Sequence, residues 1–409
     1  MSGAADPAAL LRQGAALHRQ GALAEAAALY RQVLALAPEQ PDALNLLGTV
    51  LRQQGDLPGA IALIRRAVAR QPEAPVYLAS LGAALAEAGR LEEAVAALRA
   101  ALRRRPQDGL SLRHLGQALA ALGRAREALP PLRQAVKLEP RSAEARLALA
   151  HAAREAGAGA EARREAEAAL RLAGEAAGLA GQARFLLAAL GAAAAPDRAP
   201  AAYVRDLFDQ YAPRFDEELT QRLAYRTPQA LAALLAAHGG AEGGVPAEGT
   251  LDILDLGCGT GLSGLALAPF ARRLEGLDLA PRMLAEAART GCYTALHEAD
   301  LLDFLPTRPA AYDLVAAADV LNYLGDLAPA LAAIAGALRP GGLALFSVET
   351  GAASPYALGE GLRYRHALPH LRGLCAGAGL GILAEQESVL RQERGQDVAG
   401  ALLLLRRLV

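Results

Sequence analysis

The eleven residues LDILDLGCGTG, positions 251–261, join a short apolar run to a turn rich in glycine. Residues 251–256 have the length and composition of a buried strand, and a helical pattern follows the turn. The three glycines carry no side chains, so a ligand can lie against the end of the strand and the N-terminus of the helix. Their spacing is GxGxG with Leu262 next, whereas the dinucleotide fingerprint GxGxxG would place a glycine at position 262. The segment predicts a strand–turn–helix unit that binds a ligand through its backbone.

Beyond a glycine-rich break at residues 238–249, strand-like runs alternate with helical ones. This alternation predicts a parallel sheet with crossover helices. After the first strand, we expect strands at residues 274–278, 293–297 and 312–318. The second strand ends in Asp278, seventeen positions after Gly261, where a carboxylate can accept hydrogen bonds from both hydroxyl groups of a ribose.

The N-terminal half of the chain repeats at a constant interval of thirty-four positions, the step from Gly14 to Gly48. Glycine, alanine and proline recur at that interval in four columns: Gly14, Gly48, Gly82 and Gly116, followed by Ala150; Gly21, Gly55, Gly89, Gly123 and Gly157; Ala26, Ala60, Ala94, Ala128 and Ala162; and Pro38, Pro72, Pro106 and Pro140. Each unit is expected to form two helices joined by a turn at the second glycine, and the proline ends the second helix. The small residues let the helices approach closely.

Composition limits the classes of protein to which the chain can belong. With 409 residues, of which 53% are hydrophobic and only 4% aromatic, it is long enough for two or three domains with cores mainly of alanine, leucine and valine. A net charge of -1 argues against a disordered tail or a general nucleic-acid binder. Three widely spaced cysteines argue against disulfides and zinc, and we expect no metal. Because no export signal or membrane-spanning run is recognisable, we expect a cytoplasmic protein.

The repeat units, which begin near Pro7, Pro41, Pro75, Gly109 and Ala143, resemble tetratricopeptide repeats over residues 7–176. The fifth unit departs from the pattern at Arg146 and Gly174, as a terminal cap would. The resemblance implies a groove for a protein or peptide partner, with a spacer or a dimerisation surface as the alternative. It places these residues on the groove: Asp42, Asn45, Thr49, Arg52, Val76, Ala79, Ala83, Arg113 and Gln117.

Residues 202–409 resemble the class I S-adenosylmethionine-dependent methyltransferases. The resemblance implies a Rossmann-like α/β domain and S-adenosylmethionine as the cofactor. It assigns to cofactor binding Asp255, Gly257, Cys258, Gly259 and Gly261 in the turn, Asp278 at the ribose, Met283 under the adenine, Asp300 and Leu301 at the adenine edge and ring, and Asp319 between methyl donor and acceptor. The alternatives are structural: the glycines could serve only a tight turn, Asp319 could simply end a strand, and Cys258 could matter for its small size.

Further residues are candidates for acceptor binding or catalysis, each with a structural alternative. Asn322 and Tyr323 follow the fourth strand. Arg363 could bind a carboxylate or phosphate of the substrate, or pair with surface acids. His366 could act as a base, because its pKa is ordinarily near neutrality, or cap the following helix. Tyr211 could contact the methionine part of the cofactor or pack within a lid.

We therefore expect a multidomain protein: an all-α tetratricopeptide-repeat solenoid at residues 1–190, a linker at 191–201 and the α/β methyltransferase domain at 202–409. The start of that domain, residues 202–240, is expected to form lid helices. Its helix at 203–220 also resembles the lid of a narrower group in which tetratricopeptide repeats precede a methyltransferase. A mostly apolar run at 398–405 would be the last, antiparallel strand.

Methyl transfer from a sulfonium needs an acceptor lone pair in line with the methyl–sulfur bond, and a base only where the acceptor still holds a proton. The loop at 319–323 lacks the [DN]PP[YFW] sequence typical of amino-group DNA methylation. Our first hypothesis is a methyltransferase that acts on a small-molecule or protein-bound acceptor, with the repeats recruiting the acceptor or a partner. The second hypothesis is a non-catalytic repeat scaffold whose Rossmann-like part binds the cofactor structurally or as a sensor.

Overall fold

The computed structural model describes residues 6–174, 176–212, 215–217, 225–238, 247–353, 355–359, 361–393 and 395–408. The chain forms two compact units, Met1–Ala183 and Arg184–Val409, called here the repeat unit and the sheet unit. The expected lid at 202–240 lies partly outside the described residues, as does the end of its helix at 203–220. No helix among the described residues combines the length and apolar character needed to cross a membrane.

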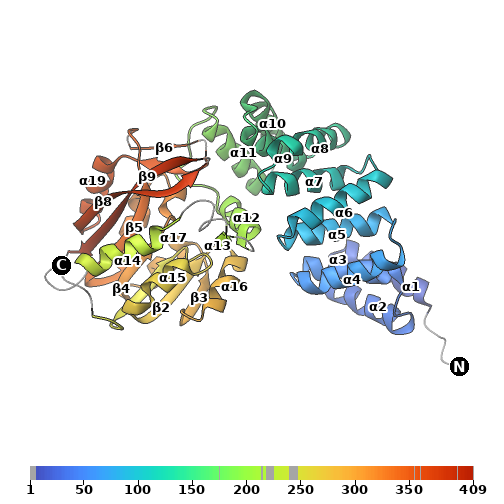
Figure 1. Ribbon diagram of the computed structural model, residues 1–409, viewed down its shortest axis with the longest axis horizontal. Helices are drawn as coiled ribbons and strands as arrows, with labels where there is room; N and C mark the ends of the chain where they lie inside the picture. Colours follow the sequence, from blue (N-terminus) through green and yellow to red (C-terminus); the bar gives the residue numbers. More distant parts are fainter. Residues whose placement is uncertain are drawn as a thin grey trace. The chain divides into compact units, whose positions relative to one another are not determined.

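The repeat unit is built from antiparallel helix pairs (Figure 1). Its helices are α1 (Pro7–Arg19), α2 (Leu23–Leu36), α3 (Pro41–Gln53), α4 (Leu57–Arg70), α5 (Pro75–Glu87), α6 (Leu91–Arg104), α7 (Gly109–Ala121), α8 (Ala125–Leu138), α9 (Ala143–Glu155) and α10 (Gly159–Ala173). A further helix, α11 (Ala177–Ala189), crosses the boundary between the two units. The expected two-helix repeats are confirmed.

Both glycine columns have a physical cause. The turn glycines, from Gly21 to Gly157, all have a positive φ between 73° and 86°, a conformation that other residues rarely adopt. The helix glycines Gly14, Gly48, Gly82 and Gly116 allow close packing, because a Cβ at each would lie within 2.6 Å of the side chain sixteen positions ahead. The repeating glycines therefore mark the same close contact and the same turn in successive helix pairs.

A ladder of ion pairs follows the same period. Arg65 pairs with Glu93, Arg99 with Glu127 and Arg133 with Glu161, always from one repeat to the next. Most of these side chains are about half exposed, so each pair contributes less than about 1 kcal/mol. The ladder adds little stability and mainly favours one register between neighbouring repeats.

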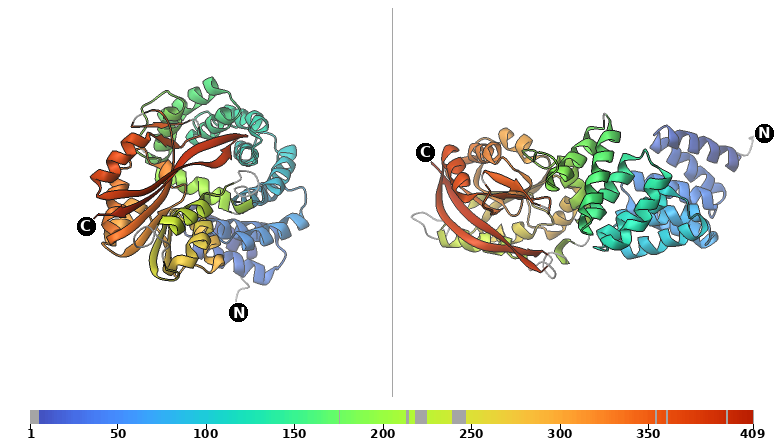
Figure 2. Two further views of the ribbon diagram at one scale, coloured as in Figure 1. Left: turned by 60° about the vertical axis from the view of Figure 1, so that its left-hand side comes forward. Right: turned by 90° about the horizontal axis from the view of Figure 1, so that it is seen from above.

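The sheet unit is organised around a seven-stranded sheet of order β3-β2-β1-β4-β5-β9-β8. Its strands are β1 (Leu251–Leu256), β2 (Ala271–Asp278), β3 (Ala295–Glu298), β4 (Tyr312–Ala317), β5 (Leu338–Glu349), β8 (Leu380–Glu393) and β9 (Gln396–Arg407). Strands β1 to β5 are parallel, whereas β9 runs antiparallel to both β5 and β8. The long strands β8 and β9 curve along one side of the sheet (Figure 2). The sequence predicted β9 but not β8, nor the small hairpin of β6 (Tyr356–Leu358) and β7 (Tyr364–His366).

Helices cover both faces of this sheet. They are α12 (Ala201–Tyr211), α13 (Phe215–Glu217), α14 (Thr227–His238), α15 (Leu262–Leu267), α16 (Pro281–Thr290), α17 (Leu301–Phe304), α18 (Ala328–Ala337) and α19 (Leu368–Gly377). Alternate residues of β1 belong to different cores: Leu254 and Leu256 pack with α18 and α19, whereas Ile253 packs with α14. The carboxyl ends of the central parallel strands, where ligands of this fold class bind, lie at one edge of the sheet.

Asp255 is on the same face of β1 as Ile253 and is completely buried. Its Oδ2 accepts hydrogen bonds from Ser263 Oγ at 2.6 Å and from the Tyr293 hydroxyl at 2.7 Å. Burial raises the pKa of this carboxyl from its ordinary 3.8 to about 6. Asp255 therefore ties β1 to α15 and to the segment before β3, beneath the glycine turn.

The raised pKa of Asp255 predicts a pH dependence of stability. Its contribution to stability is fully present below about pH 3.8 and is lost as the pH rises through about 6, because the ionised form is buried at a cost. Between about pH 4 and pH 8, the free energy of unfolding of the wild type should fall by about 3 kcal/mol more than that of Asp255→Asn. Urea denaturation across this pH range measures the difference, and parallel curves for the two proteins would contradict the assignment.

The close packing at the helix glycines predicts the effect of one added methyl group. In Gly116→Ala the new Cβ would lie 2.3 Å from Leu132 Cγ, so overpacking should lower the free energy of unfolding by about 1–3 kcal/mol. Gly159→Ala in α10 is the matched control, because its Cβ meets nothing within 4 Å. That variant should be neutral or gain up to about 1 kcal/mol. Equal effects in denaturant titrations of the two full-length variants would refute this explanation of the glycine column.

Candidate functional site

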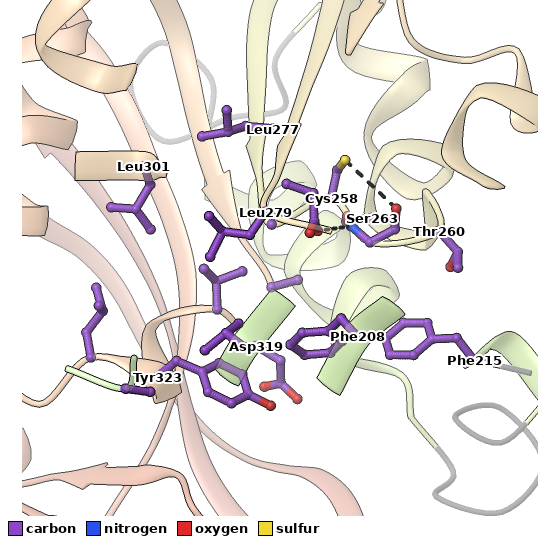
Figure 3. A pocket seen from close by; sticks show the side chains of 18 of the residues that line it. Phe208, Phe215, Cys258, Thr260, Ser263, Leu277, Leu279, Leu301, Asp319 and Tyr323 are labelled. Atoms are coloured by element: carbon purple, nitrogen blue, oxygen red, sulfur yellow. Dashed lines mark hydrogen bonds between the residues drawn. The ribbon is translucent and has the colours of Figure 1, made fainter. Parts of the chain in front are cut away.

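The glycine turn between β1 and α15 exposes backbone at the end of the strand (Figure 3). Gly257, Gly259 and Gly261 have φ values of 58°, 54° and 99°, all in the left-handed region. A Cβ at Gly257 would lie 2.4 Å from Val320 Cγ2, so this glycine lets the loop after β4 approach the turn. At Gly259, the nearest atom to a Cβ is Phe215 Cε1 at 3.6 Å, so open space adjoins this glycine.

Asp278, at the end of β2, holds the turn in place. Its Oδ2 accepts a hydrogen bond from Gly259 N at 2.9 Å, and its Oδ1 accepts one from Ala280 N at 2.8 Å. Burial raises the pKa of the Asp278 carboxyl, while these backbone hydrogen bonds act to lower it. The carboxylate thus connects the ends of two neighbouring strands, and it also lines the adjoining pocket.

A pocket extends from the glycine turn across the ends of β1, β2 and β4. Nine of the residues predicted from the sequence line it: Gly257, Cys258, Gly259, Asp278, Asp300, Leu301, Asp319, Tyr323 and Arg363. Cys258 is only 3% exposed, and burial raises the pKa of its thiol, so the thiol form is favoured. The residues that sequence analysis missed include Arg198, Phe208, Phe215, Thr260, Leu279 and Arg391.

Two predicted cofactor residues support the pocket from behind. Met283 is fully buried in a small cluster with Ala212 and Ala280, and Tyr211 packs against the same cluster. Neither side chain lines the pocket, whereas Leu279, four residues before Met283, does. Asp255 and Gly261 likewise lie outside the lining, because Asp255 faces α15 and Gly261 starts that helix. The apolar side chain nearest the adenine position is therefore Leu279.

The candidate base His366 lies in β7, away from the pocket. It is 2% exposed, and its Nε2–H donates to the carbonyl oxygen of Leu324 at 2.9 Å. Burial lowers its pKa, which favours the neutral ring. Asn322 is also fully buried: it donates to Asp319 Oδ1 at 3.2 Å and accepts from Glu349 N at 2.9 Å. Both side chains hold the loop after β4 in place and do not face a substrate.

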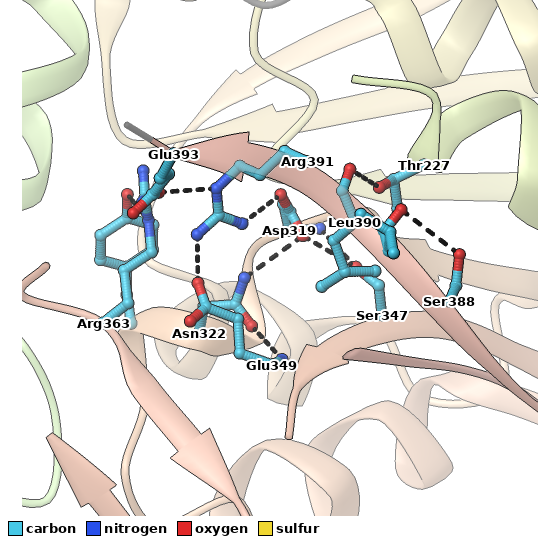
Figure 4. A network of polar contacts seen from close by, with 12 residues as sticks. Thr227, Asp319, Asn322, Ser347, Glu349, Arg363, Ser388, Leu390, Arg391 and Glu393 are labelled. Carbon is cyan, nitrogen blue, oxygen red and sulfur yellow. Dashed lines mark hydrogen bonds and ion pairs between the residues drawn. The ribbon is translucent and has the colours of Figure 1, made fainter. Parts of the chain in front are cut away.

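Asp319 begins that loop in a strained conformation, with φ at 57°. Arg391 of β8 reaches it through a buried guanidinium: Nη1 donates to Asp319 Oδ2 at 3.0 Å and Nε to Glu393 Oε1 at 2.8 Å, while Nη2 pairs with Glu349 (Figure 4). Arg363 donates from Nε to the Tyr323 hydroxyl at 3.2 Å and also pairs with Glu393. This end of the pocket is lined by two arginines, one carboxylate and one phenol.

The groove residues predicted in the repeat unit fall into two groups. Asn45 and Ala83 are only 4% and 8% exposed, so they belong to the helix packing and offer little surface to a partner. Asp42 accepts a hydrogen bond from the Tyr77 hydroxyl at 2.6 Å, and Arg52 pairs with Glu87. The polar side chains Asp42 and Arg52 are therefore already held by neighbours two helices further along the chain.

Comparisons with known proteins identify both units. Residues 254–346 match the model of a family described as a methyltransferase domain. Residues 2–41, 12–75, 45–109 and 113–178 match the model of the tetratricopeptide repeat.

Curated relatives match only the region of the glycine turn and the strands after it. The chain is 31% identical over 100 residues to the ubiquinone biosynthesis O-methyltransferase of Sodalis glossinidius, covering 24% of this chain and 40% of the relative. It is 42% identical over 93 residues to the trans-aconitate 2-methyltransferase of Pseudomonas aeruginosa, covering 22% and 33%. It is 38% identical over 97 residues to the malonyl-[acyl-carrier protein] O-methyltransferase of Serratia marcescens, covering 23% and 37%. The chain thus spans between a third and two fifths of the length of these relatives.

Solved structures with similar folds include examples of each unit. A thermophilic tetratricopeptide-repeat protein of Thermus thermophilus is 28% identical, with a TM-score of 0.38, covering 44% of this chain and 97% of its own. An S-adenosylmethionine-dependent methyltransferase of Mesorhizobium loti is 24% identical, with a TM-score of 0.35, covering 44% and 96%. On the two family models and the architecture described above, the chain belongs to the proteins that join a tetratricopeptide-repeat array to a class I methyltransferase domain.

Proposed function

We propose that the protein is an S-adenosylmethionine-dependent methyltransferase that esterifies a carboxylate of a small-molecule or protein-bound acceptor, with the repeat array recruiting the acceptor or its carrier. The observation that carries the proposal is one continuous pocket. At one end lie the glycine turn and Asp278, and at the other lie Arg363, Arg391 and Tyr323. The first end suits a nucleoside cofactor, and the second suits an anionic acceptor.

The residues around the turn fit S-adenosylmethionine. Asp278 would accept hydrogen bonds from the ribose hydroxyls, and Asp300 and Leu301 would meet the adenine edge and ring, with Leu279 beside them. The open space at Gly259 would let the ligand lie against the backbone, because a side chain there would extend toward Phe215. When bound, the cofactor supplies a methyl group on a positively charged sulfur; as an acceptor oxygen bonds to the methyl carbon, the carbon–sulfur electron pair stays on sulfur, leaving a neutral thioether.

The acceptor class is inferred from the state of the acidic groups that line the pocket. Asp319 already accepts hydrogen bonds from Arg391, Ser347 and Asn322, and Asp300 accepts from Leu302 N and pairs with Arg198. Burial raises the pKa of the Tyr225 hydroxyl well above its ordinary value, which favours the protonated phenol. These groups are poorly placed to remove a proton from an alcohol or an ammonium group. A carboxylate needs no base, because it has already lost its proton at neutral pH.

Arg363 is the residue that would hold such an acceptor. Its guanidinium lines the pocket beside the Tyr323 ring, 5.9 Å from the ring centroid, and its side chain is 27% exposed. A guanidinium can bind one oxygen of a carboxylate and leave the other oxygen for reaction with the methyl carbon. Two of the relatives reported above are named for carboxylate compounds, trans-aconitate and malonyl-[acyl-carrier protein], which supports the same class.

The alternative function is a non-catalytic scaffold in which the sheet unit binds the cofactor structurally or as a sensor. It shares the cofactor site with the first proposal and differs only in the absence of turnover. Binding and turnover therefore need separate measurements.

Asp278→Ala tests the cofactor site. Calorimetry with S-adenosylmethionine should show binding to the wild type and a loss of about tenfold or more in affinity for the variant, because a buried carboxylate no longer meets the ribose. Glu286→Ala is the matched control, since Glu286 is an exposed carboxylate of α16 that pairs with Arg289. No binding to the wild type at millimolar ligand, or equal affinities in all three proteins, would remove the cofactor proposal.

The carboxylate proposal predicts the chemistry of the methylated product. Lysate incubated with the full-length protein and a donor carrying a tritiated methyl group should gain label that mild alkali releases as volatile methanol, because methyl esters hydrolyse under these conditions. Arg363→Gln should reduce this labelling at least about tenfold while its cofactor affinity stays within about twofold.

Gly259→Arg serves as the inactive control for the same assay, because its side chain would occupy the space beside the turn. Alkali-stable label would exclude a carboxylate acceptor while keeping the methyltransferase. Equal incorporation by wild type and Gly259→Arg would favour the scaffold instead.

A further inference from the structure

The segment Pro196–Pro200, expected from the sequence to be part of a linker, is bonded to the sheet unit and is called here the strap. Arg198 forms an antiparallel bridge with Leu324 in the loop after β4. Hydrogen bonds fasten the strap on both sides: Ala199 N to the carbonyl oxygen of Tyr323 at 2.8 Å, Gly325 N and Asp326 N to the carbonyl oxygen of Asp197 at 2.7 and 3.0 Å, the Tyr364 hydroxyl to the carbonyl oxygen of Pro196 at 2.5 Å, and the Tyr356 hydroxyl to Asp197 Oδ1 at 3.0 Å. The strap is therefore an ordered part of the sheet unit.

The strap also forms part of the pocket wall. Arg198 and Ala199 line the pocket, as do Ala201 and Val204 of the helix α12 that follows. Arg198 Nη2 forms an ion pair with Asp300 Oδ2, across 102 residues of sequence. Asp300 is the carboxylate that would meet the adenine edge. The side chains of Arg198 and Asp300 are 37% and 14% exposed, so this pair faces the pocket from a partly dry position.

Both oxygens of Asp300 are directed by protein donors. Oδ1 accepts a hydrogen bond from Leu302 N at 2.9 Å, which starts α17, and Oδ2 takes the guanidinium of Arg198. A carboxylate free to rotate would meet an incoming ligand in several orientations, and ordering it would cost binding free energy. With both oxygens held, one orientation is prepared in advance, and each oxygen keeps a further lone pair for a ligand donor.

We propose that Arg198 is a positioning residue, which holds Asp300 so that it accepts a hydrogen bond from the 6-amino group of adenine. The strap that leads from α11 into the sheet unit thereby sets the preference of the pocket for an adenine nucleoside. This inference rests on the proposed cofactor. It goes further by assigning base selectivity to a residue outside the sheet and its loops.

The test compares two ligands that differ at one position. One is S-adenosylhomocysteine, the product of methyl transfer, and the other is its analogue with hydrogen in place of the 6-amino group. Calorimetry with the full-length wild type should show a preference of about tenfold or more for the amine, because the analogue leaves Asp300 without that donor. Arg198→Ala should reduce the preference to about threefold or less, and Arg198→Lys, which keeps the charge, should restore part of it.

Arg205→Ala is the control, because Arg205 is an exposed arginine of α12 that pairs with Asp206 outside the pocket lining. It should keep the wild-type preference. If Arg198→Ala weakens both ligands equally, or melts earlier with its preference intact, the strap is structural only and the inference is overturned. An equal affinity of the wild type for the two ligands would also overturn it. Failure of the wild type to bind either ligand would defeat the proposed cofactor, and this inference with it.

Discussion

The two backbone hydrogen bonds accepted by Asp278 are the interaction on which the site depends. They join the end of β2 to the glycine turn after β1 and to the start of α16. A buried carboxylate is costly unless it is satisfied by donors, and here the donors are the groups that shape the turn. The glycines make the left-handed turn possible, but Asp278 selects it. The same side chain remains on the pocket wall, where it can receive a ligand.

The opposite wall depends on charge pairing within the sheet unit. Arg391 is 2% exposed and reaches Asp319, Glu349 and Glu393 with its three guanidinium nitrogens. Removing one partner of a buried pair commonly costs about 3–5 kcal/mol, because the other charge is left buried and unpaired. This network accounts for the positive φ of Asp319, since three donors hold its side chain in place. The acceptor end is therefore preorganised before any ligand binds.

The repeat unit follows a simpler logic. In each of the first four helix pairs, a glycine packs against a large side chain sixteen positions later, and the same contact recurs in the next pair. Such an array gains stability from contacts between neighbours, so its architecture is almost fully specified by short-range pattern. The exposed ion pairs contribute little to stability, and the polar side chains Asp42 and Arg52 are already held by neighbouring helices.

The amino-acid sequence was sufficient for the architecture and for the cofactor side of the site. The constant period of the glycine, alanine and proline columns predicts helix pairs, and the run at 251–261 predicts the strand, the turn and the role of glycine. These features depend on neighbours close by in the chain. The wall residues could not be predicted in this way. Arg198 finds Asp300 across 102 residues and Arg391 finds Asp319 across 72.

The same distance in sequence explains the different outcomes for His366, Asn322 and Met283. Their residue types suit a functional site, yet packing by elements remote in sequence buries all three away from the pocket. Local pattern specifies which backbone groups will be open. Which side chains face the opening depends on strands, helices and the strap meeting in three dimensions, because burial and ion pairing are properties of the assembled fold.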